Sequence, residues 1–419
     1  MASNRSRIRV GVIFGGVSPE HEVSVISSLQ AAAALNRERY EVIPIYIAKN
    51  GWWYSGDHLL NPDTFRDLDD AVDRATPLTL DPRSYRTLRL RPEAPDSWFS
   101  RPPEPIEVDV VLPGLHGSEG ENGGLQGLLE TFNVAYAGSG VLGSALGMDK
   151  VQAKLLCQQL EIPVVDFVSF REAEWAENED DWLARIEDTL GMPVVVKPAR
   201  LGSSIGIAFA SDRDALDDAI EEALRYDDKI LVERAVQPLR EINCSVLGDP
   251  QQAQPSVLEE PVRTEDEALL TYAEKYMRGD GSSGKGGGAP TRGAKQQSGG
   301  EGMASLDREI PADIPDEMAG EIQRLAVKTF QSLECAGVAR IDFLLNGESG
   351  EIFFNEINTI PGSFSFYLWE PSGVPFDQLL DRMIEVAIKR HREKNGRIRS
   401  YDVNLLSERS LQGVKGQKQ

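Results

Sequence analysis

The spacing of apolar and polar positions divides the first third of the chain into buried strands and helices. Residues 8–14 (IRVGVIF) and 40–47 (YEVIPIYI) are nearly continuous apolar runs, which are typical of parallel strands covered on both faces. Between them, a glycine turn leads into a helix that is expected to begin near Glu22 and to end at Leu35. This strand–helix–strand order predicts a right-handed crossover and an α/β layer.

Residues 55–107 show no clean period and are rich in Pro, Asp and Arg, so we interpret them as irregular surface. The apolar run at 108–115 predicts another buried strand, followed by a glycine-rich loop and a helix from Leu125. The pattern therefore predicts a first α/β domain with a parallel sheet over residues 1–147.

The middle of the chain predicts a small α+β domain over residues 148–235. Asp149 precedes a run with helical spacing and is a suitable N-cap. A Gly/Ser loop at 201–206 interrupts the strand pattern. The expected elements are helices at 149–160 and 214–226, a Glu- and Trp-rich helix between them, and strands at 164–170, 193–197, 207–210 and 230–233.

A third domain is expected over residues 236–394, with long connections between its strands. Residues 279–302 are so rich in glycine that they cannot bury enough apolar surface to fold, which predicts a mobile loop. Residues 395–419 are expected to form a polar tail. The clearest elements are helices at 316–333 and 376–394 and a hairpin formed by 338–345 and 351–357.

The composition excludes several classes of protein. The 419 residues carry 44 Lys and Arg against 67 Asp and Glu, a formal net charge of −23. No nucleic-acid partner is expected, because sequence-independent binders need positive surface, although local cations and backbone amides can still hold a phosphate. No apolar run of about 18 residues and no signal-peptide pattern occurs, so we expect no membrane segment and a cytoplasmic location. The 3 cysteines and 4 histidines are too scattered to predict a disulfide framework or a zinc site.

The predicted hairpin places chemistry-bearing residues on one face. Glu356 and Asn358 are two apart and share a face, and a turn near residues 348–349 would set Asp342 opposite Asn355 or Glu356. Two carboxylates and an amide oxygen suit Mg²⁺, and Arg340 beside them suits a phosphoryl or acyl-phosphate group. Solvated charges on a surface hairpin are the alternative, but the apolar flanks favour a site.

A second candidate region surrounds Lys197, which ends an apolar strand just before the loop 202–206 (GSSIG). The lysine can contact a phosphate as a point charge, and the loop can offer backbone amides. The loop lacks the P-loop pattern, and a plain hairpin turn is equally consistent with it. Glu233 and Glu241 are suited to a ribose hydroxyl or to an exposed surface.

Two glycine-rich loops follow predicted parallel strands and should border one crevice, where ligands of such sheets bind. The first, residues 15–22, is not a dinucleotide fingerprint, and a favourable helix-dipole interaction is a sufficient account of Glu22. The second, residues 115–124, contains His116, for which structural and functional interpretations are equally balanced.

In this order, seven motifs resemble those of the D-alanine–D-alanine ligases in the ATP-grasp superfamily, over about residues 8–394. The motifs are GGVSPEHEVS (15–24), HGSEGENGGLQG (116–127), GMDK (147–150), VVKPARLGSSIG (195–206), EKY (274–276), ARIDF (339–343) and NEINTIPGS (355–363). The resemblance implies a three-domain ATP-grasp fold in which 1–147 bind substrate and 148–235 and 236–394 form the two ATP-grasp subdomains. It implies ATP-dependent ligation of two D-alanines through a D-alanyl phosphate, for cell-wall peptide, by a homodimer that does not bind membranes.

The resemblance also implies a role for each matching residue. Glu22, Ser203 and Tyr276 would form a hydrogen-bonded set in which Glu22 holds the first D-alanine's ammonium. Arg340 and the Gly362 amide would stabilise the oxyanion. Substrate contacts would come from His116, from Lys275 and from one of Ser363, Ser365 or Tyr367. ATP contacts would come from Lys150, Lys197, Ser204, Glu233, Arg234, Glu241 and Lys275, and two Mg²⁺ (or Mn²⁺) would bind Asp342, Glu356 and Asn358.

The chain departs from the family pattern at three places: the glycine-rich insertion, Arg234 in place of a lysine, and the acceptor motif. Members commonly carry PGxTxxS, whose last serine helps bind the second carboxylate, whereas Phe364 and Tyr367 stand at the threonine and serine here. One alternative is therefore a related ligase that joins D-alanine, or another amino acid, to a different acceptor. The other, a non-catalytic nucleotide-binding module, is disfavoured because Arg340 and the metal set are all present.

Overall fold

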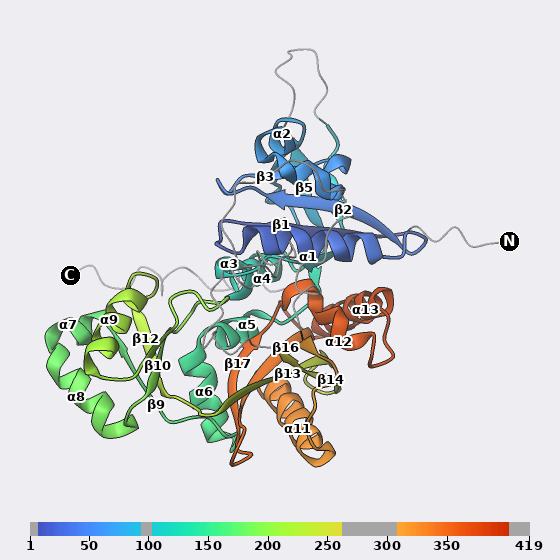
Figure 1. Cartoon of the computed structure of the whole chain (residues 1–419). Coiled ribbons are helices and arrows are strands. Elements are labelled where there is room, and N and C mark those ends of the chain that lie inside the picture. Colours follow the sequence, from blue (N-terminus) through green and yellow to red (C-terminus); the bar gives the residue numbers. More distant parts are fainter. Residues whose placement is uncertain (1–6, 94–102, 262–307, 402–419) are drawn as a thin grey trace, which may run out of the picture.

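A computed structural model describes residues 7–93, 103–261 and 308–401 (Figure 1). The described residues form a three-domain α/β fold, with one β-sheet in each domain. The three sheets lie in sequence within the three predicted ranges. No helix among these residues is both long enough and apolar enough to cross a membrane. Lys275, Tyr276 and the glycine-rich segment 279–302 lie outside the described residues, as does most of the predicted tail.

The first sheet has eight strands in the order β6-β5-β4-β3-β2-β1-β7-β8. Its parallel half confirms the predicted layer, because β1 pairs in parallel with both β2 and β7. The pairing buries Val10, Val12 and Phe14 completely. The parallel strands are β1 (Ile8–Gly15), β2 (Tyr40–Ile47), β7 (Val110–Pro113) and β8 (Ala135–Tyr136).

The interpretation of residues 55–107 as irregular is wrong. They extend the first sheet with short antiparallel strands, and these carry the buried side chains of Leu78, Leu88 and Leu90. Strands of three to five residues are too short to show an alternating period. The elements here are β3 (Trp53–Ser55), η1 (Asp57–Leu60), η2 (Pro62–Arg66), α2 (Leu68–Asp73), β4 (Thr76–Leu80), β5 (Leu88–Pro92) and β6 (Ile106–Val108).

Helix α1 fastens the two glycine-rich loops to each other. Ser24 Oγ accepts a hydrogen bond from the Gly15 amide at 2.8 Å and donates to the Gly114 carbonyl at 2.6 Å. The ends of β1 and β7 are therefore held at one edge of the sheet, as expected for a ligand-binding crevice. The helices of this domain are α1 (His21–Ala34), α3 (Ser118–Glu121), α4 (Gly124–Thr131) and α5 (Val141–Met148).

The central domain is an antiparallel sheet in the order β11-β10-β12-β9, covered by two helices that pack on its apolar face. Asp149 caps α6 as predicted, since its side chain accepts from the Gln152 amide at 3.0 Å. The elements are α6 (Lys150–Gln159), β9 (Phe167–Arg171), α7 (Glu172–Glu177), α8 (Glu179–Leu190), β10 (Val194–Pro198), β11 (Ala208–Ala210), α9 (Arg213–Leu224) and β12 (Lys229–Arg234).

The third domain is a five-stranded sheet in the order β15-β14-β13-β16-β17. The predicted hairpin is confirmed: Asp342 on β16 pairs with Glu356 on β17. The elements are β13 (Leu239–Gly248), β14 (Ala253–Pro261), β15 (Arg308–Glu309), α11 (Asp316–Ser332), β16 (Gly337–Asn346), β17 (Ile352–Asn358), η4 (Gly362–Ser365), α12 (Phe366–Trp369) and α13 (Phe376–Asn395).

The last helix joins the third domain to the first. Figure 1 shows α13 close to α1, and Leu379, Leu380 and Met383 belong to the same apolar core as Val10 and Phe14. Arg390 also donates to the Gly138 carbonyl at 2.7 Å. Because this core is shared, the first sheet and the hairpin are held in a fixed relation, and a catalytic site can form between them.

Candidate active site

The polar face of the third sheet contains an ordered row of side chains. Across neighbouring strands, Glu259 pairs with Asn243, Asn243 with Asp342, and Asp342 with Glu356. Residues in register on adjacent strands point to the same face. Asp342, Asn243 and Glu259 are buried, so this row is not a solvated surface.

Arg340 and Asn358 complete the predicted metal and oxyanion cluster. Arg340 donates two hydrogen bonds of 2.7 Å to Asp342, and Asn358 Nδ2 donates to the same carboxylate at 3.2 Å. Burial and the neighbouring charges of Glu356 and Glu259 raise the pKa of Asp342, against the opposing effect of Arg340. Two carboxylates that repel each other beside an amide oxygen fit a divalent cation, which would neutralise them.

Two lysines and one glutamate of the central domain lie at the edge of the sheet formed by β17. Lys150 Nζ lies 3.0 Å from Glu356 and donates to the Leu201 carbonyl at 2.5 Å. Lys197 Nζ lies 2.5 Å from Glu233 and 2.9 Å from Asn355 Oδ1. Both lysines that were predicted to bind phosphate therefore lie beside Glu356 or its neighbour Asn355, an arrangement that could serve the transfer of a phosphoryl group.

Lys154 is a member of this cluster that the sequence analysis missed. Its side chain is fully buried, and its Nζ lies 2.6 Å from Glu233 and 3.1 Å from the Phe354 carbonyl. Burial alone would raise the pKa of Glu233, but Lys154 and Lys197 lower it to about 2. The signal was present, because Lys154 is four residues after Lys150 and shares its helix face.

The other predicted nucleotide contacts lie around this cluster. Glu241 is half-buried on β13 and contributes, after Glu233 and Glu356, to a pKa of Lys197 that stays raised in spite of burial. Ser204 lies in the 201–206 loop with a left-handed backbone, φ 57°. Arg234 is exposed and lies 3.5 Å from Asp166, at the outer end of β12.

The assignment of Glu22 to the substrate site is corrected by the structure. Glu22 is exposed and pairs with Lys49 at 2.5 Å, whereas Glu20 is buried and accepts a hydrogen bond from Ser203 Oγ. Along a helix, side chains two residues apart are rotated by about 200° around its axis. Glu20, at the N-cap of α1, and Glu22 therefore point in nearly opposite directions. Glu20 is four residues before the buried Ser24, a spacing that could have identified it.

A second carboxyl group accompanies Glu20. Glu121 is buried and accepts from the Gly117 amide at 2.6 Å. Burial, followed by the charge of Glu20, raises the pKa of Glu121 from 4.5 to about 8. Glu121 therefore keeps its proton near neutral pH, and a cationic group bound beside the two carboxyl groups would displace that proton.

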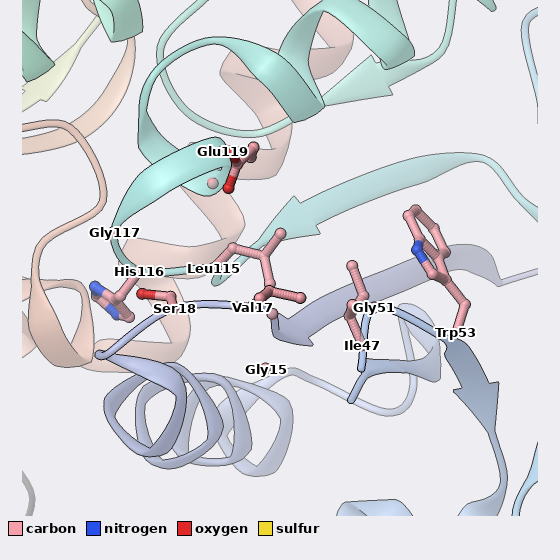
Figure 2. A pocket seen from close by; sticks show the side chains of 12 residues that line it. Gly15, Val17, Ser18, Ile47, Gly51, Trp53, Leu115, His116, Gly117 and Glu119 are labelled. Carbon is pink, nitrogen blue, oxygen red and sulfur yellow. The ribbon is translucent and has the colours of Figure 1, made fainter. Parts of the chain in front are cut away.

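His116 lies beside a cavity at the ends of β1 and β7. The cavity has a volume of about 530 Å³ and is lined by residues 15–18, 115–117 and 119–120 together with Ile47, Gly51 and Trp53. Figure 2 shows His116 at one end and Trp53 at the other. Burial and the charge of Arg340 lower the pKa of His116 to about 4. Among the described residues Nε2 has no hydrogen-bond partner, so a neutral imidazole is available to a ligand.

The segment after Gly362 has an unusual backbone. Ser363, Phe364 and Ser365 have φ of 52°, 53° and 52°, a left-handed conformation that is costly for residues with side chains. The Ser363 amide donates to Ser27 Oγ on α1 at 2.8 Å, which fixes the turn against the first domain. Both serine side chains are fully buried, whereas Tyr367 faces Glu259 and donates to it at 3.2 Å.

The shifted pKa of Glu121 predicts how stability depends on pH. The folded protein holds a proton on Glu121 up to about pH 8, whereas the unfolded chain loses it near 4.5. The contribution of this group to stability is therefore complete below the unfolded pKa and is lost as the pH rises through the folded value. We expect Glu121→Gln to flatten the decline of melting temperature from about pH 5 to about pH 9, measured by thermal unfolding. An unchanged slope would show that Glu121 titrates normally.

Comparison with known proteins identifies the family. The model for the N-terminal domain of D-Ala-D-Ala ligases matches residues 9–139, and the model for the C-terminal domain matches 156–286 and 296–385. D-alanine–D-alanine ligase of Caldicellulosiruptor bescii is 38% identical over 93% of this chain and 97% of its own, and that of Thermosipho melanesiensis is 36% identical over 95% and 98%.

Solved structures agree with these matches. The D-alanine–D-alanine ligase of Coxiella burnetii superposes with a TM-score of 0.69 at 28% identity, covering 93% of this chain and 96% of its own. The VanG D-Ala:D-Ser ligase of Enterococcus faecalis superposes with a TM-score of 0.72 at 30% identity, covering 91% and 100%. With matches over nearly the whole length of both chains, this protein belongs to the D-alanine–D-alanine ligase family.

Proposed function

We propose that this protein joins two D-alanine molecules into D-alanyl-D-alanine, with conversion of ATP to ADP and phosphate, for cell-wall peptide synthesis. The membership of the family supports the reaction. The observation that carries it for this chain is that Lys150, Lys197, Asp342, Glu356 and Arg340 meet at one edge of the third sheet. A reaction that uses ATP and makes a cell-wall precursor belongs in the cytoplasm, and by family resemblance the enzyme is a homodimer.

The first D-alanine is proposed to bind between the first domain and the hairpin. Its ammonium would lie beside Glu20 and Glu121 and would displace the proton of Glu121. His116 Nε2 would donate to its carboxylate, because a neutral imidazole can place its hydrogen on that nitrogen. Ser203 connects Glu20 to the central domain and so couples this subsite to the nucleotide side.

ATP is proposed to bind between the central sheet and β17. Glu233 and Glu241 would contact the nucleoside, and Lys150 and Lys197 the phosphates. Asp342, Glu356 and Asn358 would hold two Mg²⁺, which neutralise phosphate charge when bound. Lys197 is paired with Glu233 here, so its contact with phosphate would require it to exchange that partner, and Lys154 would then remain to balance Glu233.

The proposed reaction has two steps. A carboxylate oxygen of the first D-alanine attacks the γ-phosphorus, and the bond to the bridging oxygen of ADP breaks, which gives D-alanyl phosphate. The amine of the second D-alanine, after loss of a proton, attacks the carbonyl carbon, and phosphate leaves with the electron pair. Arg340 and the Gly362 amide would stabilise the oxyanion between these events.

A second candidate is ligation of D-alanine to another acceptor. Two observations favour its consideration: Tyr367 stands where the family commonly has serine, and a D-Ala:D-Ser ligase is among the similar structures. The test is ADP release with D-alanine alone, followed by mass spectrometry of the product. D-alanyl-D-alanine as product supports our proposal, and ADP release only on addition of another acceptor supports this alternative.

We expect Glu356→Gln to reduce turnover about a hundredfold or more. The change removes one negative charge from the proposed metal site, which must hold Mg²⁺ beside a phosphoryl group. Folding should be retained, since Glu356 is partly exposed at the sheet edge. The measurement is ADP release at fixed Mg²⁺, with Glu351→Gln in the exposed hairpin turn as the matched control. Near-wild-type turnover of Glu356→Gln would remove it from the metal site.

The two glutamates of the first loop provide a paired test of the corrected assignment. Glu20→Gln should raise the KM of the first D-alanine about tenfold or more, because it removes the charge opposite the ammonium. Glu22→Gln breaks only an exposed pair with Lys49 and should leave both KM values near wild type. Steady-state kinetics with D-alanine varied give separate KM values for the first and the second D-alanine site. The reverse result would restore Glu22 as the substrate residue.

A further inference from the structure

Glu259, at the far end of the polar row on β14, has a carboxylate that the proposed reaction does not use. Its side chain is 1% exposed and has three hydrogen-bonding partners. It accepts from Tyr367 Oη at 3.2 Å, from Asn243 Nδ2 at 3.1 Å and from Arg308 Nη1 at 2.5 Å. A buried carboxylate of this kind is held in one orientation by its partners.

Arg308 holds the same tyrosine from a second direction. Its guanidinium lies 4.1 Å from the centroid of the Tyr367 ring, a cation–π contact, while it also pairs with Glu259. The arginine is fixed in turn by β15, which pairs with the end of β14. Tyr367 is thus restrained at its hydroxyl by Glu259 and at its ring face by Arg308.

The location of this tyrosine assigns it to one side of the reaction centre. Lys150, which is proposed to bind ATP, contacts Glu356 at the β17 edge, whereas Glu259 and Tyr367 lie on the β14 side of the same row. Arg340 lies between the two sides, close enough that its charge lowers the pKa of Tyr367 against the larger effect of burial. Arg340 is the residue proposed to stabilise the oxyanion that forms when the acceptor amine adds to the carbonyl carbon. A ring held next to Arg340 therefore borders the space that the acceptor would occupy.

We propose that Glu259 and Arg308 are positioning residues of the acceptor subsite, which hold the Tyr367 ring as a rigid wall that admits only a small D-amino acid. The inference rests on the proposed ligation and deepens it. A serine at position 367 could not form this wall, and neither Glu259 nor Arg308 would then have an aromatic ring to hold. The three residues act as one unit that replaces the usual serine.

The test is a comparison of Glu259→Gln with Glu260→Gln in the full-length enzyme. Glu260 is the next residue on β14 but pairs with Arg240 at 2.8 Å, away from the row, so it is a matched control. Loss of the charged bonds at Glu259 should raise the second-site KM for D-alanine about tenfold, with the first-site KM unchanged. Given D-alanine mixed with D-valine, Glu259→Gln should also form a larger share of mixed dipeptide than wild type, measured by mass spectrometry.

Two further variants keep the test decisive if Glu259→Gln folds poorly. Tyr367→Phe retains the ring and loses only the hydroxyl, so it should give a smaller second-site effect. Arg308→Lys retains the charge and should be less affected than Arg308→Met. Unchanged second-site KM and product ratio in these variants would overturn the proposal, and so would an equal rise in both KM values with a lower melting temperature, which indicates a structural role. Failure of the wild type to make D-alanyl-D-alanine would instead reject the proposed function.

Discussion

The pairing register of the β16/β17 hairpin is the constraint on which the rest of the site depends. With Asp342 opposite Glu356, both carboxylates and Asn358 point to the polar face, and a slip of one residue would send them into the apolar core. The register is fixed by the other face, where Ile341, Phe343 and Phe354 are buried against α11 and α6. The hydrophobic core therefore determines the face on which the carboxylates lie, and so where groups of the other two domains can meet them.

Contacts made by few side chains bring each domain to this hairpin. Lys150 and Lys197 approach from the central domain, and Ser363 is fixed to Ser27 of the first domain. The shared core of α1 and α13 sets the distance between the first sheet and the row. The central domain is also joined to the hairpin through α6, because Ala153 and Cys157 belong to the same apolar core as Ile341 and Phe354.

The regular elements and the hairpin could be predicted from the sequence, because long apolar runs and the two-residue period of a strand are compatible with few other structures. It failed for β3 to β6, whose strands are too short to show a period. It also failed where burial is decided by the tertiary structure: Glu20 rather than Glu22 faces Ser203, and Lys154 and Glu259 are buried charges whose partners are distant in sequence. No spacing rule predicts such pairs, although the helix faces of Glu20 and Lys154 contained a usable signal.

Buried charges in the described part of the site are costly to desolvate, and neighbouring groups offset that cost. An isolated buried carboxylate or ammonium is strongly unfavourable, yet Glu233 has two lysines and Glu259 has an arginine, an amide and a phenol. Glu121 differs from these, because burial and the charge of Glu20 raise its pKa to about 8 and it keeps a proton near neutral pH. The proposed D-alanine carries one ammonium and one carboxylate, so it would bring a cation to Glu20 and Glu121 and an anion to the neutral His116. In the proposed reaction, protein groups would therefore balance the buried charges beside the nucleotide, whereas the zwitterionic amino acid itself would take part in the charge balance of the first subsite.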